Sequence, residues 1–122
     1  MSNVGGEDVS AGMRQRWSEA LWRFARAPKM TDQRERQADV IEAIKQQLDD
    51  VCTVQQLRVH YQTSAALCDQ IVRALYPDDP FLADPHRTRD VAYGLRYVEL
   101  MTGRRMSAFE SLPSWIGEWA VL

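Results

Sequence analysis

The stretch DPHRTRDVAYGLRYVELMTG, residues 84–103, contains a complete set of helix signals. Asp84 is a typical N-cap residue, and Pro85 directly after it suits the first position of a helix. Apolar side chains then recur every three or four residues: Val91, Leu95, Val98 and Met101 or Thr102. This spacing predicts one buried stripe, and Gly103 is typical of the residue at which a helix stops. The stretch therefore predicts a helix over residues 85–102.

Apolar residues also recur at helical spacing in the segments before this stretch. A first helix is predicted from Ser10 to just before Pro28, with an apolar stripe of Met13, Trp17, Ala20, Leu21 and Phe24. A second, of about 18 to 20 residues, is predicted from Thr31, with a stripe of Ile41, Ile44, Leu48 and Val51. Both stripes predict helices that bury one face.

Two further helices are predicted between residues 53 and 76. Thr53 and Gln56 have the spacing of a capping box, in which two side chains satisfy each other's backbone amides. The apolar side chains that follow share a face: Val54, Leu57 and Tyr61. Ser64 is the predicted cap of the next helix, which runs to about Tyr76 with Leu67, Cys68, Ile71 and Leu75 inward.

No stretch alternates apolar and polar residues as a strand does. A last helical segment is predicted from Ser107 onward, with Trp115, Ile116 and Trp119 at helical spacing. The fold class is therefore all-α: a compact bundle of five or six helices with no sheet. The predicted core comprises Trp17, Leu21, Phe24, Ile41, Ile44, Leu48, Leu57, Cys68, Ile71, Leu75, Val91, Leu95 and Val98.

The length of 122 residues fits one domain. Residues 1–9 are small, polar and acidic, and they are predicted to form a flexible N-terminal tail. Residues 10–122 are predicted to form a single helical domain. Residues 77–86 contain three prolines and are predicted to form an ordered loop that packs Phe81 and Leu82 onto the bundle.

The composition of the chain indicates its expected cellular location and excludes some classes of binding partner. The net charge of −2 does not indicate bulk binding to a polyanion, and no apolar run is long enough to span a membrane. The N-terminus lacks the pattern of a signal peptide, so a cytoplasmic location is expected. Thirteen arginines against two lysines suggest a bacterial, GC-rich genome. Cys52 and Cys68 are expected to be thiols, packed as small apolar groups.

The sequence predicts neither catalysis nor a cofactor. Cys52, Cys68, His60 and His86 lack the paired spacing of a zinc site, and no calcium-loop pattern occurs. His60 and Cys68 are the one pair that suggests a nucleophile with a base, but Cys68 is expected to be buried and inert. No phosphate-binding loop or hydrolase motif is present. We therefore expect a non-enzyme without metal or cofactor.

Residues 53–73 resemble a bacterial helix-turn-helix, in which a first helix braces a recognition helix that reads the major groove. The resemblance implies that Arg58, Ser64, Gln70 and Arg73 form the nucleic-acid-binding surface. Two positions depart from the motif, because Arg58 stands where a small residue is typical and Gln62 stands where glycine is favoured in the turn. Asp69 would also face phosphates. A plain helical hairpin within a bundle is the alternative.

Charge is segregated along the chain. Arginines dominate the first predicted helix and the surroundings of residues 85–102, whereas residues 32–50 and 78–84 are acidic. This pattern favours ion pairing between helices of the same chain, and the alternative is an acidic partner on one face and a basic partner on another.

Trp22 lies off the predicted stripe of its helix and beside Arg23 and Arg26. Tryptophan and arginine are enriched at binding hot spots, so these three residues are the predicted partner-binding site, for a second copy of the chain or another protein. Packing of Trp22 against Trp115 or Trp119 of the same chain is the competing interpretation. The leading hypothesis is a protein-interaction or regulatory subunit, and the alternative is a DNA-binding regulator.

Overall fold

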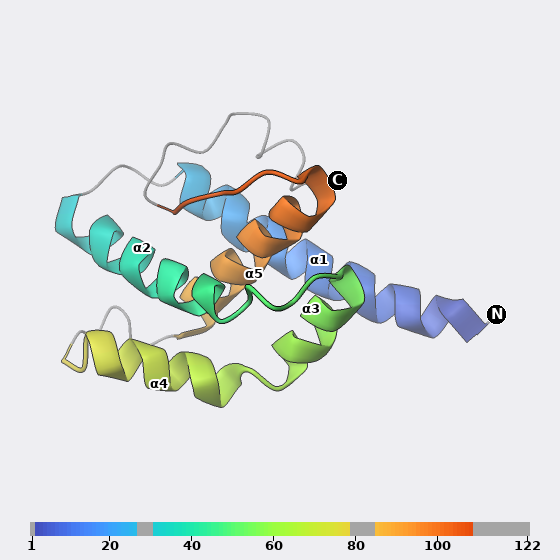
Figure 1. The fold of residues 1–122 in the computed structure, drawn as a ribbon, viewed down its shortest axis with the longest axis horizontal. Helices are drawn as coiled ribbons and strands as arrows, with labels where there is room; N and C mark the ends of the chain where they lie inside the picture. The colour runs from blue at the N-terminus through green and yellow to red at the C-terminus, as the bar shows by residue number, and fades with distance from the viewer. Residues whose placement is uncertain (1, 27–30, 79–84, 109–122) are drawn as a thin grey trace.

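The computed structural model describes residues 2–26, 31–78 and 85–108 (Figure 1). These residues form five helices and contain no strand, which confirms the all-α prediction. Side chains are described for residues 12–24, 35–78 and 88–108. The predictions for Phe81, Leu82, Trp115 and Trp119, and for a sixth helix, lie outside the described residues.

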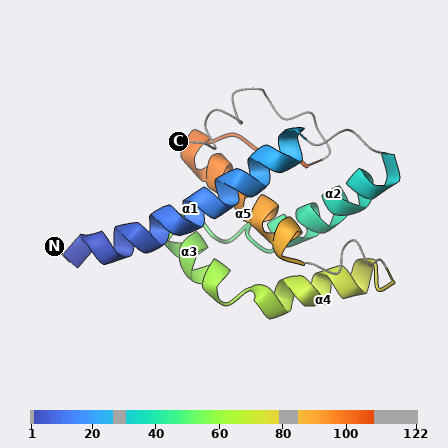
Figure 2. The same cartoon turned by 180° about the vertical axis from the view of Figure 1, so that it is seen from behind.

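Helix α5, Pro85–Thr102, is the central element of the bundle, and its bounds are those that Pro85 and Gly103 predict. The other four helices all pack against it (Figures 1 and 2). Residues 88–95 and 97–99 are all buried, so α5 is covered nearly all round and not along one stripe alone. At the C-terminal end Met101 is 55% exposed, so neither Met101 nor Thr102 continues the buried stripe.

Helix α1, Ser2–Arg26, lies along α5 and is its most extensive neighbour. Gly94 permits this approach, because a Cβ added there would lie 3.0 Å from the backbone oxygen of Trp17. The helix begins at Ser2, so the predicted start at Ser10 is wrong, and its N-terminal part extends beyond the other helices (Figure 2). The flexibility predicted for residues 1–9 stays a prediction.

Helix α2, Thr31–Gln46, packs on α5 and α4. Ile41, Ile44 and Leu48 are buried as predicted. The helix is shorter than the sequence predicted, because hydrogen-bonded turns replace it from residue 47 to residue 51. These turns lead the chain to α3.

Helix α3, Val54–Gln62, begins at the predicted cap. The Thr53 hydroxyl accepts a hydrogen bond from the Gln56 amide at 3.1 Å. The Gln56 side chain reaches back one residue further than in a capping box, to the Cys52 amide at 2.9 Å. Leu57 and Tyr61 are buried against the bundle, as their spacing predicts.

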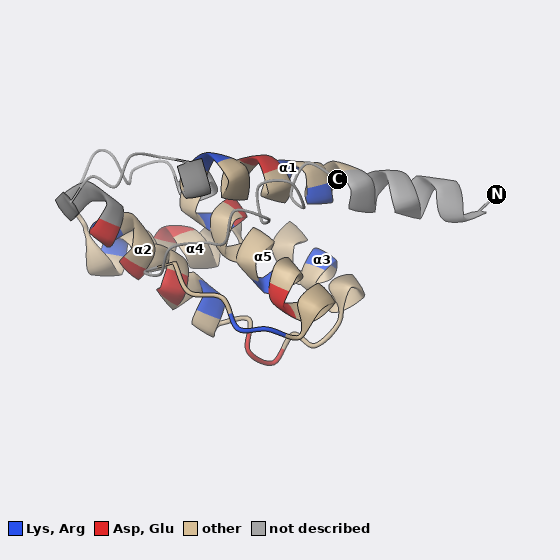
Figure 3. Cartoon of the chain, turned by 90° about the horizontal axis from the view of Figure 1, so that it is seen from above, with Lys and Arg blue, Asp and Glu red and all other residues tan. Residues whose placement is uncertain are grey.

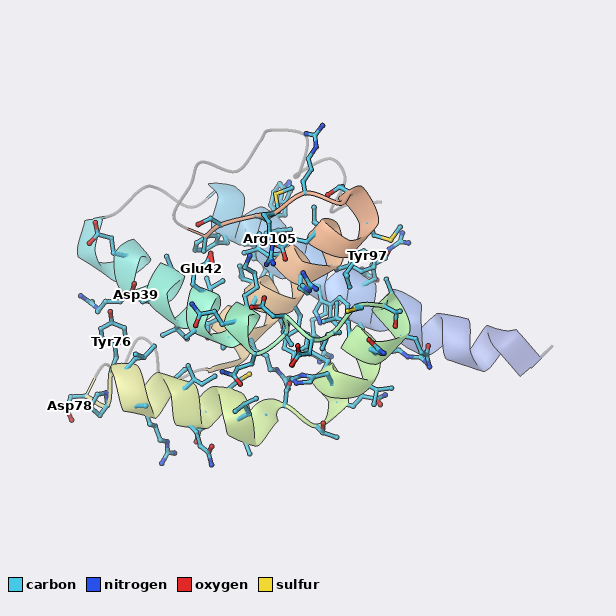
Figure 4. All side chains as sticks on the ribbon, in the orientation of Figure 1. Asp39, Glu42, Tyr76, Asp78, Tyr97 and Arg105 are labelled. Carbon is cyan, nitrogen blue, oxygen red and sulfur yellow. The ribbon has the colours of Figure 1, made fainter. Side chains whose placement is uncertain are left out.

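Helix α4, Ala65–Leu75, packs on α5 and α2 through Cys68 and Val72. Ile71 is partly buried against the core. Leu75 is 45% exposed, so its place in the predicted core is wrong. Leu75 is the last residue of α4. The next residue, Tyr76, contacts α2, because its hydroxyl donates a hydrogen bond to Asp39 (Figure 4).

After α5 the chain turns at Gly103, whose φ of 72° is the left-handed conformation that glycine adopts without strain. The Gly103 amide bonds the Glu99 carbonyl at 2.8 Å and ends the helix. Residues 103–108, here called the strap, then run back along the bundle towards the side on which α1 ends (Figures 1 and 2). Met106 and Ala108 are buried there.

Candidate interaction site

The exposed side of α1 is the candidate interaction site. We call it the α1 outer face and define it by its exposed described side chains: Arg14, Gln15, Arg16, Glu19, Trp22 and Arg23. Trp22 follows Trp17 by five positions, roughly 140° around a helix. Trp17 is 2% exposed and Trp22 is 36% exposed, so the two indoles serve opposite sides of α1.

The α1 outer face carries three arginines against Glu19, the only acidic residue among residues 12–24. These charges lie along the upper edge of the molecule in Figure 3. Hydrogen bonding to the Tyr61 hydroxyl raises the pKa of Arg16, and the negative charge of Asp90 raises it further. Two of the three predicted partner-binding residues, Trp22 and Arg23, are therefore together at the surface. The side chain of Arg26 is outside the described part of the chain.

Of the four residues predicted to bind DNA, Ser64 is buried and the other three lie on two different helices. Ser64 is 2% exposed, and its hydroxyl donates to the Tyr61 carbonyl at 2.9 Å and does not cap α4. Gln70 and Arg73 are exposed on α4, where Arg73 pairs with Asp69 at 3.0 Å. Arg58 lies on α3 and donates to Gln55 at 2.8 Å.

The packing of α3 and α4 also differs from a helix-turn-helix. Each of them packs mainly on α5, and α4 also packs on α2, whereas contacts between α3 and α4 are minor. Two residues, Thr63 and Ser64, separate these helices, which is shorter than the usual turn. A bracing contact between two helices is what orients a recognition helix, and here α5 provides the support instead.

An aromatic cluster that the sequence did not predict lies at the junction of α1, α3 and α5. Trp17 contacts Tyr61, Tyr93 and Tyr97, with ring centroids 5.3 to 5.9 Å apart. Tyr61 and Tyr93 meet edge to face at 5.0 Å. Tyr97, labelled in Figure 4, lies on the same part of α5. Such pairs contribute about 0.5–1.5 kcal/mol each beyond burial.

The Tyr61 and Tyr93 hydroxyls of this aromatic cluster have partners on neighbouring elements, whereas the buried Trp17 indole nitrogen has no hydrogen-bond partner among the described residues. The Tyr61 hydroxyl donates to Asp90 at 2.5 Å, and the Tyr93 hydroxyl shares a 2.5 Å hydrogen bond with Nδ1 of His60. The Arg89 guanidinium lies 4.1 Å from the Tyr61 ring centroid. Burial raises the pKa of Tyr93 to about 12, and burial together with the bond to Asp90 raises the pKa of Tyr61.

A second buried cluster, made of charges, lies between α2, α5 and the strap. Glu99 pairs with Lys45 at 2.6 Å and with Arg96 at 3.1 Å, and it accepts from the Met106 amide at 2.7 Å. Arg96 also donates to the Val51 carbonyl at 2.8 Å. Burial raises the pKa of Glu99, but the bonds from Lys45, Met106 and Arg96 outweigh it, and the net pKa lies below its ordinary value.

This ionic cluster holds the strap on the bundle. The Lys45 ammonium donates to the Met106 carbonyl, and Glu42 accepts from the Ala108 amide at 3.0 Å. Near the surface, Arg105 pairs with Asp49 at 3.4 Å. Figure 4 shows Glu42 on α2 and Arg105 on the strap. The pair of Arg105 with Asp49 is an ion pair between a basic and an acidic segment of the chain, as the charge pattern predicts for part of the segregated charge.

The two cysteines differ from each other. Cys68 is fully buried, and burial raises the pKa of its thiol to about 11, so the thiol is protonated and inert near neutral pH. Cys52 is an exposed thiol, so the expectation that it packs as a small apolar group is wrong. Among the described residues no three His, Cys, Asp or Glu side chains are grouped as metal ligands would be.

Comparisons with known protein families, with curated proteins and with solved structures gave no match to this chain. Within residues 2–26, 31–78 and 85–108, no helix combines the length and the apolar character needed to cross a membrane.

Proposed function

We propose that this chain is a non-catalytic protein-interaction or regulatory subunit, in the cytoplasm of a bacterium, which binds its partner through the α1 outer face. The observation that carries the proposal is the position of Trp22. It is 36% exposed on a helix whose opposite side supplies Trp17, Leu21 and Phe24 to the core. Burying a tryptophan beside an arginine is a common source of binding energy at protein interfaces.

The charge of the α1 outer face favours a different protein over a second copy. Two copies meeting through this face about a two-fold axis would bring like charges together, since three of its four charged side chains are arginines. A partner with an acidic rim around an apolar pocket fits both the indole and the charges. We therefore expect the partner to be a different, acidic protein. Self-association through this face would contradict that expectation.

Quantitative affinity capture from the native host, read by mass spectrometry, tests this proposal. The wild type is compared with Trp22→Ala and with Val59→Ala, which removes an apolar side chain that is 52% exposed on α3. We expect one protein to bind the wild type and Val59→Ala but to bind Trp22→Ala about thirtyfold more weakly, the equivalent of about 2 kcal/mol. Equal capture by all three chains contradicts the proposal.

DNA binding is the second candidate, and one observation favours it: Gln70 and Arg73 are exposed on α4, the position of a recognition helix. Fluorescence anisotropy with duplex DNA at several salt concentrations tests it. Under this alternative Arg73→Ala weakens binding and reduces the salt slope by about one. Under the leading proposal the chain shows no DNA binding that depends on Arg73.

A further inference from the structure

The strap is held on the bundle through its main chain. The Met106 amide donates to Glu99 at 2.7 Å, and the Lys45 ammonium donates to the Met106 carbonyl. Two residues further along, the Ala108 amide donates to Glu42 at 3.0 Å. Side chains of α2 and α5 therefore bind the backbone of the strap, and this binding does not depend on how the strap is joined to its own helix. The strap of a second copy, in the same register, can make the same contacts.

The strap is also a small and separable part of the core. Of its six residues only Met106 and Ala108 are buried. The side chains that bind its backbone, Lys45 and Glu99 among them, are charged, and water hydrates charged groups well. Release of the strap therefore exposes little apolar surface and lets water hydrate the charges that it uncovers.

A single exposed glycine joins the strap to α5. Gly103 has a φ of 72°, and its amide bonds the Glu99 carbonyl at 2.8 Å. A Cβ at this position would meet no atom within 4 Å, so the turn is set by its own backbone and not by packed side chains. Residues 101–105 are all exposed. The chain can therefore leave α5 in another direction at Gly103 without unpacking the core.

We propose that two copies of this chain exchange their straps, so that the strap of each copy binds to α2 and α5 of the other. The strap contacts are the same in the closed monomer and in the exchanged dimer, so the turn at Gly103 and the chain concentration decide between the two forms. A short tether gives an effective concentration in the millimolar range, so we expect a dimer dissociation constant on the order of 1 mM for the wild type. The exchange uses no residue of the α1 outer face, so it is independent of the function proposed above.

Gly103→Ala tests the proposal, with Gly12→Ala as its matched control. The left-handed conformation disfavours alanine by about five- to thirtyfold at each turn, and formation of one exchanged dimer opens two turns. We therefore expect Gly103→Ala to tighten the dimer at least about 25-fold. Gly12 is an exposed helical position with equal room for a Cβ, and its variant should keep the wild-type dissociation constant.

Light scattering from micromolar to millimolar chain concentration measures the mass of the wild type and of both variants. We expect dimers of Gly103→Ala at concentrations where the wild type and Gly12→Ala are monomers. A Gly103→Ala chain that behaves as Gly12→Ala does throughout this range overturns the proposal.

Thiol cross-linking distinguishes exchanged straps from an ordinary dimer of closed chains. Asp49→Cys and Arg105→Cys place thiols at an exposed ion pair whose charged atoms lie 3.4 Å apart. They are combined with Cys52→Ser and Gly103→Ala, and the remaining thiol, that of Cys68, is buried. In exchanged dimers a short bismaleimide should join the strap of one chain to the other chain, which gives covalent dimers on a denaturing gel. Links within single chains only, in a sample that light scattering shows to be dimeric, overturn the proposal.

Discussion

The two buried clusters around α5 both fix other elements to this helix, but one does so mainly with aromatic rings and the other with charged side chains. The aromatic cluster joins α1, α3 and α5 through rings and neutral hydroxyls, with Tyr61 and Tyr93 at its centre. The ionic cluster joins α2, α5 and the strap through full charges, with Glu99 at its centre. Buried charges need all their partners, because removing one leaves an uncompensated ion, whereas a packed ring keeps most of its contacts when a hydroxyl is lost. The two clusters should therefore differ in their response to mutation and to pH.

The largest effect is expected at Glu99. Glu99→Gln leaves Lys45 and Arg96 buried without their shared carboxylate and should lower the free energy of unfolding by about 3–5 kcal/mol. Urea denaturation measures this, with Glu19→Gln on the exposed side of α1 as the control, for which a change within about 0.5 kcal/mol is expected. Equal losses for the two variants contradict a special role for the ionic cluster.

The pH dependence of Glu99 follows from its lowered pKa. In the unfolded chain the carboxyl has its ordinary pKa of 4.5, and in the folded chain its pKa is lower, so the unfolded state binds protons first. The stabilisation is therefore fully present above about pH 4.5 and is lost as the pH falls through the folded pKa. The wild type should lose this part of its stability on acidification, and Glu99→Gln should not.

Between the two clusters α5 is held by apolar packing. Truncation of Leu95 tests how much this packing contributes to the free energy of unfolding. Leu95 is fully buried, whereas Leu75, which the sequence placed in the same core, is 45% exposed. Leu95→Ala should lower the free energy of unfolding by about 2–5 kcal/mol, and Leu75→Ala by much less. Chemical denaturation of both variants gives the comparison, and a similar cost for both would contradict the exposed position of Leu75 at the end of α4.

The aromatic cluster should be more tolerant. Tyr61→Phe removes one donor to Asp90 and should cost about 1.5–3 kcal/mol, since that hydrogen bond is to an ionised group. Tyr76→Phe removes the bond to Asp39, which is only partly buried, and should cost less. Thermal unfolding of both variants measures the difference, and a larger loss for Tyr76→Phe contradicts it.

High pH should reduce the stability that the aromatic cluster contributes, just as low pH should reduce the stability that the ionic cluster contributes. The folded pKa values of Tyr61 and Tyr93 lie above the ordinary tyrosine pKa of 10, so the folded state holds these protons more tightly than the unfolded state does. Their stabilisation is present below about pH 10 and is lost as the pH rises through the folded pKa values, towards about 12 for Tyr93. Tyrosinate absorbance should show two hydroxyls that ionise late or together with unfolding.

The smallest effect is expected at the start of α3, the helix that supplies His60 and Tyr61. Thr53→Ala removes the side-chain acceptor of the Gln56 amide and should cost about 1 kcal/mol. Thr63→Ala, at the other end of α3, is the control, because its exposed hydroxyl bonds the His60 carbonyl at 3.3 Å. Urea midpoints of the two variants measure the difference, and no loss for Thr53→Ala contradicts a role for this cap.

Local signals explain how far the sequence could predict the fold. Pro85 and Gly103 mark the ends of α5 because each acts on its own backbone, so the bounds of this helix were predictable. The start of α1 carries no comparable signal, so a helix was predicted only from Ser10, whereas the structure has helix from Ser2. Leu75 follows the spacing of a buried stripe but lies on the last turn of α4, where spacing does not reveal whether a neighbour is present.

Both buried clusters escaped prediction because their contacts are distant in sequence. His60 meets Tyr93 across 33 residues, and Lys45 meets Glu99 across 54. Helical periodicity gives the direction of a side chain but not the helix that it faces. The exposure of Trp22 could be predicted, since a position off the stripe is itself a local property, and the structure places this side chain at the surface.

Site-specific photocrosslinking in the native host tests the central claim, that the α1 outer face is the functional surface. A photoreactive amino acid is placed at position 23 on α1, at position 59 on α3 or at position 70 on α4, all exposed positions. The account predicts a covalent adduct with one protein from position 23 and none from position 59 or 70. Adducts with DNA from position 70, or protein adducts from position 59 but not from position 23, would contradict it.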